Sequence, residues 1–388
     1  MHHIIRFIAA VLVSCLSASL TSAAPASNDP VRSLIEGWAA DNQIPGVSFA
    51  VIRDGDVVRT EGIGLANVEH RAPTKAISRF RSGSLVKPIT ATAVLQLAAS
   101  GKLDLDKPAW HYCSAFPKKT HPVTSRALLS HTSGVRSYRM PWSRYEAELY
   151  NKTRFTSVPA SLTLFADDPL IYEPGTDHVY TSYGYNLLGC VIEGASGMAY
   201  MAYLKQHIFN VAGMNDTSID RHEDVVPDRA GGYRRAKNGA LLHVDYMDLT
   251  GKIPGGGLLT TAVDMARFAA AFMNGRLLAP EQMALAMQPI TLRDGSTQPY
   301  GLGWGLELPT KDNPQDIRLF HGGVTPGVSA IMYLIPARKS GVVIISNLYV
   351  VEGREALARR LLQHIGRPDE TAMTTQTTTF TRPFSSWR

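Results

Sequence analysis

The sequence is poor in the residues that build metal and nucleotide sites. Its 388 residues include only 3 cysteines, and no group of His and Cys has the spacing of a zinc site. A glycine-rich phosphate-binding loop is also missing. These absences disfavour a metal-dependent or nucleotide-dependent enzyme, so we expect no metal and no cofactor.

The sequence also has no large excess of either positive or negative charge. The 39 Lys and Arg residues face 33 Asp and Glu residues, a net charge of +6, and no run of basic residues forms a stripe. Proteins that bind nucleic acid concentrate positive charge on one surface. We therefore expect no nucleic-acid partner.

Long hydrophobic runs are confined to the first residues. Residues 1–24 contain one basic residue, Arg6, then an apolar stretch over 7–20, and they end in Ser22-Ala23-Ala24. This order is typical of a cleaved signal peptide, and the stretch is too short to favour a membrane-spanning helix. A rival interpretation is a lipoprotein cleavage box at 12–15, with Cys15 as the lipidated residue. Either one predicts export, to the periplasm or medium, and a mature chain without an integral membrane segment.

Two cysteines, Cys113 and Cys190, remain after such a cleavage. Two residues so far apart do not make a disulfide scaffold, although a single bridge stays open in an oxidising compartment. Cys190 stands among Leu187, Leu188, Val191 and Ile192. That setting favours a small buried apolar residue.

Ser84 and Lys87 form a Ser-x-x-Lys pair just before the apolar run Ile89 to Ala99, which predicts a helix ending near Gly101. Residues three apart share one helix face, so the Lys87 ammonium can reach the Ser84 hydroxyl. A serine becomes a good nucleophile when a neighbour accepts its proton. Taken alone, the pair favours the simpler interpretation of a capping serine and a solvated lysine.

Strand and helix patterns divide the chain into ends and middle. Period-two and apolar runs predict terminal elements at Val31–Asn42 (helix), Gly46–Arg53 and Asp56–Gly62 (hairpin), Arg318–His321, Val328–Ile335 and Gly341–Ser346 (strands), and Glu352–Ile365 (helix). We expect an α/β (α+β) fold: an antiparallel sheet from residues 31–80 and 300–365, flanked by terminal helices, with a mainly helical part over 84–290 inserted. One domain then spans 25–368, before a Thr-rich tail, 369–388, of disordered composition.

Further motifs accompany the Ser-x-x-Lys pair in a fixed order. They are Leu128-Leu129-Ser130-His131-Thr132-Ser133-Gly134, Tyr180-Thr181-Ser182, Gly255-Gly256-Gly257-Leu258, Tyr300-Gly301-Leu302-Gly303-Trp304 and Phe320-His321-Gly322-Gly323. From about Val31 to Ile365 the chain resembles the penicillin-recognising serine hydrolases. These include class C β-lactamases, D-alanyl-D-alanine carboxypeptidases and related esterases. It is most similar to β-lactamase-related proteins whose third motif begins with His. The resemblance implies a β-lactamase/transpeptidase-like fold with the site between sheet and helices.

The resemblance also implies roles for single residues. Ser84 would be the nucleophile, with Lys87 or Tyr180 as its base. A phenol ionises near pH 10, so Tyr180 can act as the base only if flanking cations lower its pKa. Lys87 and His321 are the candidates for such cations. Gly322 and Gly323 would let substrate approach the strand edge, and the N–H groups of Ser84 and Val324 would form the oxyanion hole. His131 is expected to be a satisfied packing residue.

Two positions depart from the family pattern. Ser182 stands in place of the asparagine of Tyr-x-Asn, and His321 in place of the lysine of Lys-Thr-Gly. Both changes weaken the expected grip on a β-lactam. The sequence therefore predicts a serine hydrolase that forms an acyl-enzyme with a small-molecule or peptide substrate: an esterase, D-peptidase or weak β-lactamase. The alternative is a non-catalytic, penicillin-binding-like binding or sensing module.

Overall fold

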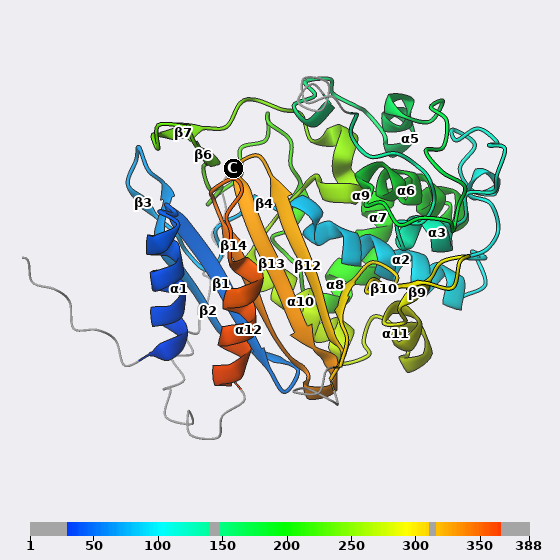
Figure 1. The fold of residues 1–388 in the computed structure, drawn as a ribbon. Helices are drawn as coiled ribbons and strands as arrows, with labels where there is room; N and C mark the ends of the chain where they lie inside the picture. The colour runs from blue at the N-terminus through cyan, green and yellow to red at the C-terminus, as the bar shows by residue number, and fades with distance from the viewer. Residues whose placement is uncertain (1–28, 140–147, 310–315, 366–388) are drawn as a thin grey trace, which may run out of the picture.

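A seven-stranded sheet forms the centre of the computed structural model, which describes residues 29–139, 148–309 and 316–365. The strand order is β11-β12-β13-β14-β1-β2-β3, and neighbouring strands are antiparallel. The strands are β1 (Gly46–Arg53), β2 (Asp56–Asn67), β3 (Ala72–Pro73), β11 (Gly305–Glu307), β12 (Arg318–Thr325), β13 (Val328–Ile335) and β14 (Ser340–Ser346). Pairing of β1 with β14 joins the two ends of the chain, as Figure 1 shows. The predicted fold class is confirmed.

The β1–β2 hairpin shows how local sequence sets the sheet. Its turn residues, Asp54 and Gly55, have φ angles of 53° and 85°. Positive φ at both central positions is the turn geometry that matches the twist of paired strands, and Asp-Gly is a preferred sequence for it. The hairpin lies where the sequence predicts it, although β2 continues beyond Gly62 to Asn67.

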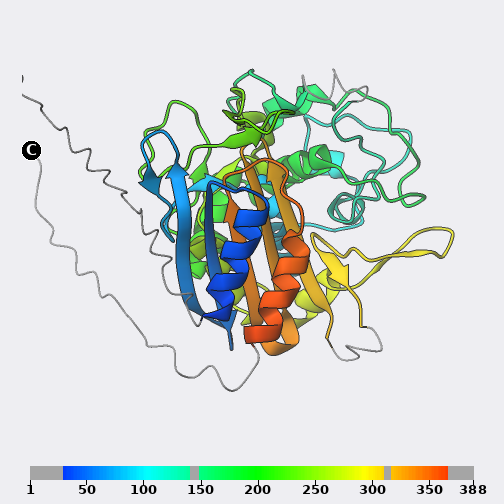
Figure 2. The ribbon, with the colours of Figure 1, turned by 60° about the vertical axis from the view of Figure 1, so that its left-hand side comes forward.

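Two terminal helices, α1 (Pro30–Asp41) and α12 (Arg354–Ile365), cover one face of the sheet (Figure 2). The α1 helix begins at an Asp29 cap, whose side chain accepts a hydrogen bond from Arg32 N, with Pro30 in the first turn. Its buried face packs with that of α12 and with the outward side chains of β1, β13 and β14. Burial of a large apolar side chain contributes roughly 1.5–3 kcal/mol, so this layer stabilises the junction of the two chain ends.

The inserted helical part packs against the other face, where α10 (Ala262–Met273) contacts β1, β2 and β14. Behind it lie α2 (Lys87–Ala99) and α6 (Ser182–Ser196), which are in contact with each other. Side chains all round α2 are buried, which is the pattern of a helix at the core of a large domain. This central position makes α2 a rigid base for the residues at its N-terminus.

Shorter elements complete the described chain. The helices are α3 (Ser125–Leu129), α5 (Val158–Ser161), α7 (Tyr200–Leu204), α8 (Asn210–Ala212), α9 (Ile253–Gly256) and α11 (Pro280–Ala286). The small sheets comprise β4 (Phe80–Arg81), β8 (Leu258–Thr260) and β5 (Ser218–Ile219); β6 (Tyr233–Arg235) and β7 (Leu241–His243); and β9 (Ile290–Thr291) and β10 (Thr297–Gln298). Across the described ranges no single helix has the length and apolarity to cross a bilayer. One pair, Ser182–Ser196 with Tyr200–Ala212, meets that test jointly but is bent by 76°.

Cys113 and Cys190 form a disulfide, with their Cα atoms 5.4 Å apart. The bridge ties the turn after the 3₁₀ helix η2 (Ala109–His111) to the middle of α6. Cys190 is buried among apolar residues as its sequence setting indicates, but the interpretation as an unbridged apolar residue is wrong. Residues 77 positions apart meet because α6 crosses the helical part, which no local pattern reveals.

The expected signal peptide, residues 1–24, and the expected tail, residues 369–388, lie outside the described residues. Both therefore stay predictions, as do the domain limits at 25 and 368.

Candidate active site

Ser84 lies in a 3₁₀ turn, η1 (Gly83–Val86), that runs directly into α2 at Lys87. In a 3₁₀ turn the side chains at i and i+3 lie one above the other. Lys87 Nζ is accordingly 2.9 Å from Ser84 Oγ. The apolar run after Lys87 forms the predicted helix, which ends at Ala99, two residues before Gly101. The structure thus brings the Ser-x-x-Lys pair into contact.

Lys87 is entirely buried and has two further polar contacts. Its Nζ lies 2.7 Å from the carbonyl oxygen of Gly255 and 3.2 Å from Ser182 Oγ. Burial lowers the pKa of Lys87 from 10.5 to about 7. A neutral amine has two N–H donors and one lone pair. If Gly255 and Ser182 accept the two N–H bonds, the lone pair faces the Ser84 hydroxyl and can accept its proton.

Tyr180 lies just before α6 and contacts the Ser84–Lys87 pair. Its hydroxyl is hydrogen-bonded to Ser84, and its ring centroid lies 4.9 Å from Lys87 Nζ. Although 40% of the residue is exposed, burial around the hydroxyl raises the Tyr180 pKa well above its ordinary value of 10. Desolvation is the largest cause of this rise, so the condition for Tyr180 to act as the base, a pKa lowered by flanking cations, is not met. Tyr180 is a protonated phenol in the free protein.

His321 lies on β12 and is only 5% exposed. The centroid of its ring is 6.3 Å from that of Tyr180, so His321 faces the Tyr180-Thr181-Ser182 motif, as the sequence predicts. Burial, together with the nearby Lys87, lowers the His321 pKa to about 3. His321 is therefore neutral at physiological pH, and its suggested role as a cation beside Tyr180 is wrong.

The edge of β12 lies directly against the turn that carries Ser84. Gly83 has φ +48°, and a Cβ added there would lie 2.9 Å from Val324 N. At Gly323 an added Cβ would meet Ser82 O at 2.5 Å, so the contact between the two segments itself requires glycine. At Gly322 the nearest atom would be 3.9 Å away, which leaves room along the strand. The Val324 N–H thus lies next to the nucleophile turn, where the predicted oxyanion hole needs it.

Sequence reasoning missed the role of Gly255 and understated that of His131. His131 is fully buried, as expected for a packing residue, but it also holds both neighbours of Tyr180. Its carbonyl oxygen accepts from Val179 N at 3.0 Å and its Nδ1 from Thr181 N at 3.1 Å. Its ring centroid lies 4.2 Å from that of Tyr180. The Leu-Ser-His-Thr-Ser-Gly motif marks the position, but only the fold shows the contact.

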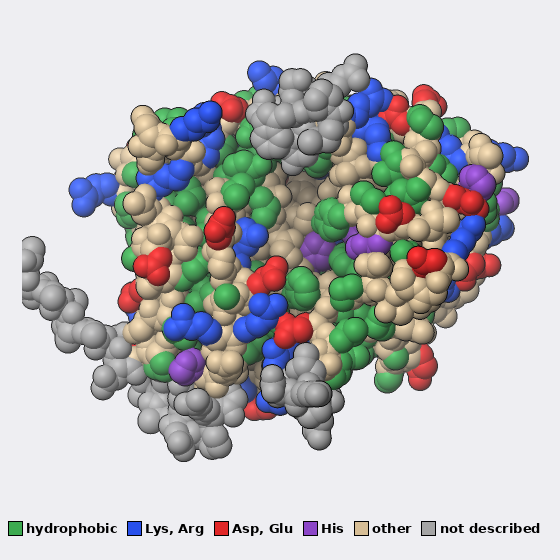
Figure 3. Space-filling model, viewed as in Figure 1, with side chains coloured by type: hydrophobic (Ala, Val, Ile, Leu, Met, Phe, Trp, Pro, Cys, Tyr) green, Lys and Arg blue, Asp and Glu red, His purple; other side chains and the backbone are tan. Residues whose placement is uncertain are grey.

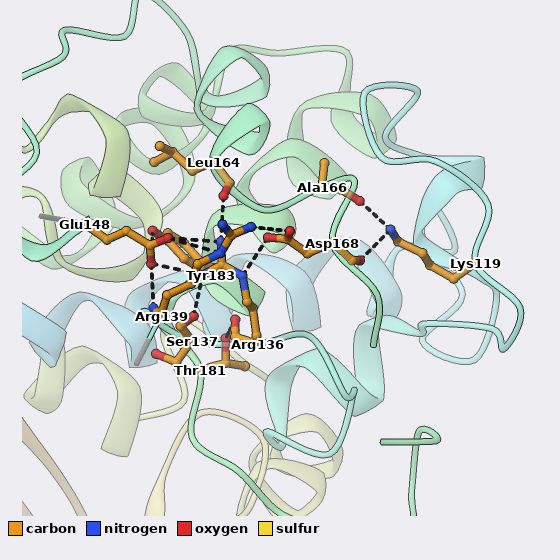
Figure 4. A network of polar contacts seen from close by, with 10 residues as sticks. All are labelled: Lys119, Arg136, Ser137, Arg139, Glu148, Leu164, Ala166, Asp168, Thr181 and Tyr183. Atoms are coloured by element: carbon orange, nitrogen blue, oxygen red, sulfur yellow. Dashed lines mark hydrogen bonds and ion pairs between the residues drawn. The ribbon is translucent and has the colours of Figure 1, made fainter. Parts of the chain in front are cut away.

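A network of charged groups lies next to Thr181, the residue before α6 (Figure 4). Arg136 donates from Nε to Asp168 at 2.6 Å and from its two terminal nitrogens to Glu148 at 3.0 and 3.1 Å. Arg139 joins both carboxylates. The Arg136 carbonyl oxygen accepts from Thr181 Oγ1 at 2.8 Å, and Thr181 also caps α6. Bidentate, partly buried Arg–carboxylate pairs hold their geometry well, so the network fixes the start of α6.

Figure 3 shows histidine side chains at a hollow in the surface of the molecule. Within residues 29–139, 148–309 and 316–365, no group of three or more His, Cys, Asp or Glu side chains could hold a metal ion. The chemistry available at this site is that of a Ser–Lys–Tyr cluster around a buried lysine, beside an open strand edge.

Comparison with known proteins gives one family match, to the family described as Beta-lactamase, over residues 31–366. Among curated relatives, the mitochondrial serine beta-lactamase-like protein LACTB of Bos taurus is 28% identical, over 79% of this chain and 71% of the relative. Penicillin-binding protein 4* of Bacillus subtilis (strain 168) is also 28% identical, over 87% of this chain and 76% of the relative.

Solved structures give the same result for the fold. The octameric penicillin-binding protein homologue from Pyrococcus abyssi superposes with a TM-score of 0.74 and is 26% identical. The match covers 86% of this chain and 76% of that one. The sheet with its inserted helical part is therefore a fold shared with this homologue.

Proposed function

This chain belongs to the Beta-lactamase family and is a serine hydrolase, and we propose that it is exported and cleaves an ester, amide or peptide bond through an acyl-enzyme on Ser84. Lys87 is the general base, Tyr180 the proton donor to the leaving group, and Ser84 N–H and Val324 N–H the oxyanion hole. Ser182 and His321, with Gly322 and Gly323, line the substrate groove.

One observation carries the proposal: the three contacts of Lys87 Nζ, to Ser84, Ser182 and Gly255. A base must lie within about 2.6–3.2 Å of the proton it removes and have a pKa near the working pH. Lys87 meets both conditions, whereas the raised pKa of Tyr180 disfavours it as the base. This arrangement also explains Ser182, because a hydroxyl is sufficient to accept one N–H bond from Lys87.

The reaction follows from these positions. Lys87 takes the Ser84 proton as Oγ bonds to the substrate carbonyl carbon, and the oxyanion forms against the two backbone N–H groups. The bond to the leaving group then breaks, and the departing atom receives a proton from Tyr180, which recovers one from the Lys87 ammonium. Water next attacks the acyl-enzyme, giving its proton to Lys87. The Ser84–acyl bond breaks and Ser84 Oγ takes that proton from the Lys87 ammonium, so both groups return to their starting states.

Labelling of Ser84 tests the mechanism. A fluorophosphonate probe should label the wild type and fail to label Ser84→Ala, and hydrolysis of p-nitrophenyl esters should fall about 10⁴- to 10⁶-fold in that variant. Ser84 is half-buried and small, so the folded state should survive the change, which circular dichroism checks. Turnover retained by folded Ser84→Ala would refute the acyl-enzyme. Stable labelling without turnover would instead favour the binding or sensing module.

Export is supported by the leader-like residues 1–24 and by the Cys113–Cys190 disulfide, since disulfides persist in oxidising compartments. One relative, LACTB, is mitochondrial by name, so it does not itself support export to the periplasm or medium. Expression of the full chain in a bacterial host and mass analysis of the mature product is the test. A new N-terminus at Pro25 supports the signal peptide, and a lipid-modified Cys15 supports a membrane-anchored lipoprotein. An uncleaved cytoplasmic product would contradict export.

A further inference from the structure

Four hydrogen bonds connect the Tyr180-Thr181-Ser182 motif with the Phe320-His321-Gly322-Gly323 motif through the interior. Thr181 N–H donates to His131 Nδ1 at 3.1 Å, and His131 Nε2 lies 3.2 Å from the Tyr300 hydroxyl. The same hydroxyl lies 3.2 Å from His321 Nε2, and His321 Nδ1 lies 2.8 Å from the carbonyl oxygen of Gly322. His131, Tyr300 and His321 are all at least nine-tenths buried.

The two ends of this chain of hydrogen bonds determine the ring protons of both histidines, while the Tyr300 hydroxyl also has Tyr185 as a neighbouring hydrogen-bond partner. A backbone N–H can only donate, so His131 Nδ1 has a lone pair and the ring proton lies on Nε2. That proton points to Tyr300, whose own hydroxyl proton is then free to point to His321 Nε2. At the other end a carbonyl oxygen can only accept, so His321 carries its proton on Nδ1. Both imidazoles are neutral, and His321 has no unoccupied ring nitrogen.

A cationic His321 would require the Tyr300 hydroxyl proton to turn away from Nε2. The ring would then be charged inside a site where Lys87 lies close by and where burial already lowers the His321 pKa. Tyr300, oriented by His131, thus keeps His321 uncharged by hydrogen-bonding geometry as well as by desolvation.

We infer that Tyr300 and His131 are positioning residues that hold His321 neutral, so that the site selects substrates whose leaving group carries no carboxylate. This inference rests on the proposed function. Tyr180 gives its proton to the leaving group, so the leaving group lies beside Tyr180, and His321 faces the same side. A cation there would attract a carboxylate on the leaving group, whereas a neutral imidazole with both nitrogens engaged does not compensate for its desolvation. Uncharged alcohol or amine leaving groups are the class that fits.

A matched pair of substrates tests the selectivity. The butyrate esters of 3-hydroxybenzamide and 3-hydroxybenzoate have leaving groups of similar size, and only the second carries a carboxylate. The wild type should prefer the benzamide ester in kcat/KM by about tenfold or more, the range expected for a charged group that finds no partner. His321→Gln, which is neutral, should keep this ratio within about threefold, and His321→Lys should lower it by about tenfold or more. Equal rates on the two esters, or a preference for the benzoate ester, would overturn the inference.

The protonation state of His321 is the second readout, because a purely structural role of Tyr300 would not change it. The ¹⁵N shifts of His321, assigned by comparison with His321→Gln, should show a bare Nε2 and a protonated Nδ1, unchanged from about pH 8 to pH 5. Tyr300→Phe frees Nε2 for protonation, so the ¹⁵N shifts of His321 should then change between about pH 8 and pH 5, and the selectivity ratio should fall. Tyr200→Phe is the matched control, since it deletes another buried hydroxyl, one bonded to Thr90. A doubly protonated His321 in the wild type, or identical patterns in Tyr300→Phe and the wild type, would refute it.

Failure of this inference is separable from failure of the proposed function. If Ser84→Ala abolishes cleavage of both esters while His321 proves cationic, the acyl-enzyme stands and only the selectivity argument fails. If Ser84→Ala still cleaves both esters, the mechanism itself is wrong.

Discussion

The pH dependence of kcat/KM identifies the base, because the three candidate groups titrate in different ranges. Lys87 must be neutral to accept the Ser84 proton, and burial places its pKa at about 7. Neutral Lys87 would then fall from about half at pH 7 to about 9% at pH 6 and about 1% at pH 5. We expect kcat/KM to rise with an apparent pKa near 7, and to lie about a hundredfold below its plateau at pH 5.

The other assignments predict different curves. If Tyr180 were the base, its raised pKa would put the rise above pH 10, since the phenolate is the active form. If His321 were the base, its pKa of about 3 would complete the rise by about pH 5. The position of the acid limb therefore separates all three groups in a single experiment.

A second buried lysine supplies the control. Lys252 is 5% exposed, and burial also lowers its pKa to about 7, but its Nζ donates to the carbonyl oxygen of Leu149. Lys252→Met should leave the limb near pH 7 in place, whereas Lys87→Met should remove most activity. Activity would be followed on a p-nitrophenyl ester from pH 4.5 to 10 in constant ionic strength. A level profile over about pH 5 to 9, or a limb that disappears in folded Lys252→Met, would refute the assignment of Lys87.

Three further outcomes are expected. Lys252 has a lower pKa in the folded state than in the unfolded state, where it is about 10.4. The unfolded state therefore binds more protons between pH 7 and 9, and wild-type stability relative to Lys252→Met should rise by about 2 kcal/mol over that range, measured by urea unfolding; a constant difference would contradict this. Replacing Cys113 and Cys190 by alanine releases a link across 77 residues and should cost about 4–5 kcal/mol of unfolding free energy on the chain-entropy model, whereas a loss below about 1 kcal/mol would argue against the bridge. Gly83→Ala should reduce kcat/KM by about tenfold or more, because the new Cβ would displace Val324. Gly101→Ala is the control: Gly101 also has a positive φ, but an added Cβ there would meet nothing within 4 Å, so this change should lower only stability, by about 1–2 kcal/mol. Equal effects of the two changes on kcat/KM would count against the role of the Val324 N–H.

Local patterns predicted the parts of the fold that depend on short-range order. The hairpin turn at Asp54-Gly55, strand β13 and helix α2 lie at or within a residue or two of their expected limits, because turn chemistry and apolar periodicity act over a few residues. The Ser84–Lys87 contact belongs to the same class, since three residues of helical backbone are enough to bring the two groups together. The disulfide depends on contact between distant segments, and the sequence left the pairing of Cys113 with Cys190 open.

The sequence by itself determined which groups do chemistry: a serine beside a lysine on one helical turn, and tyrosine, serine and histidine motifs in a recognisable order. Only the tertiary structure decided their charge states. Whether Lys87, Tyr180 and His321 are ionised depends on how far each is removed from water and on which donor or acceptor faces it, and those partners come from distant segments. Gly255 and Ser182 reach Lys87 across 168 and 95 residues, and Tyr300 reaches His131 across 169. A motif carries the identity of a side chain, but its pKa is a property of the packed interior around it.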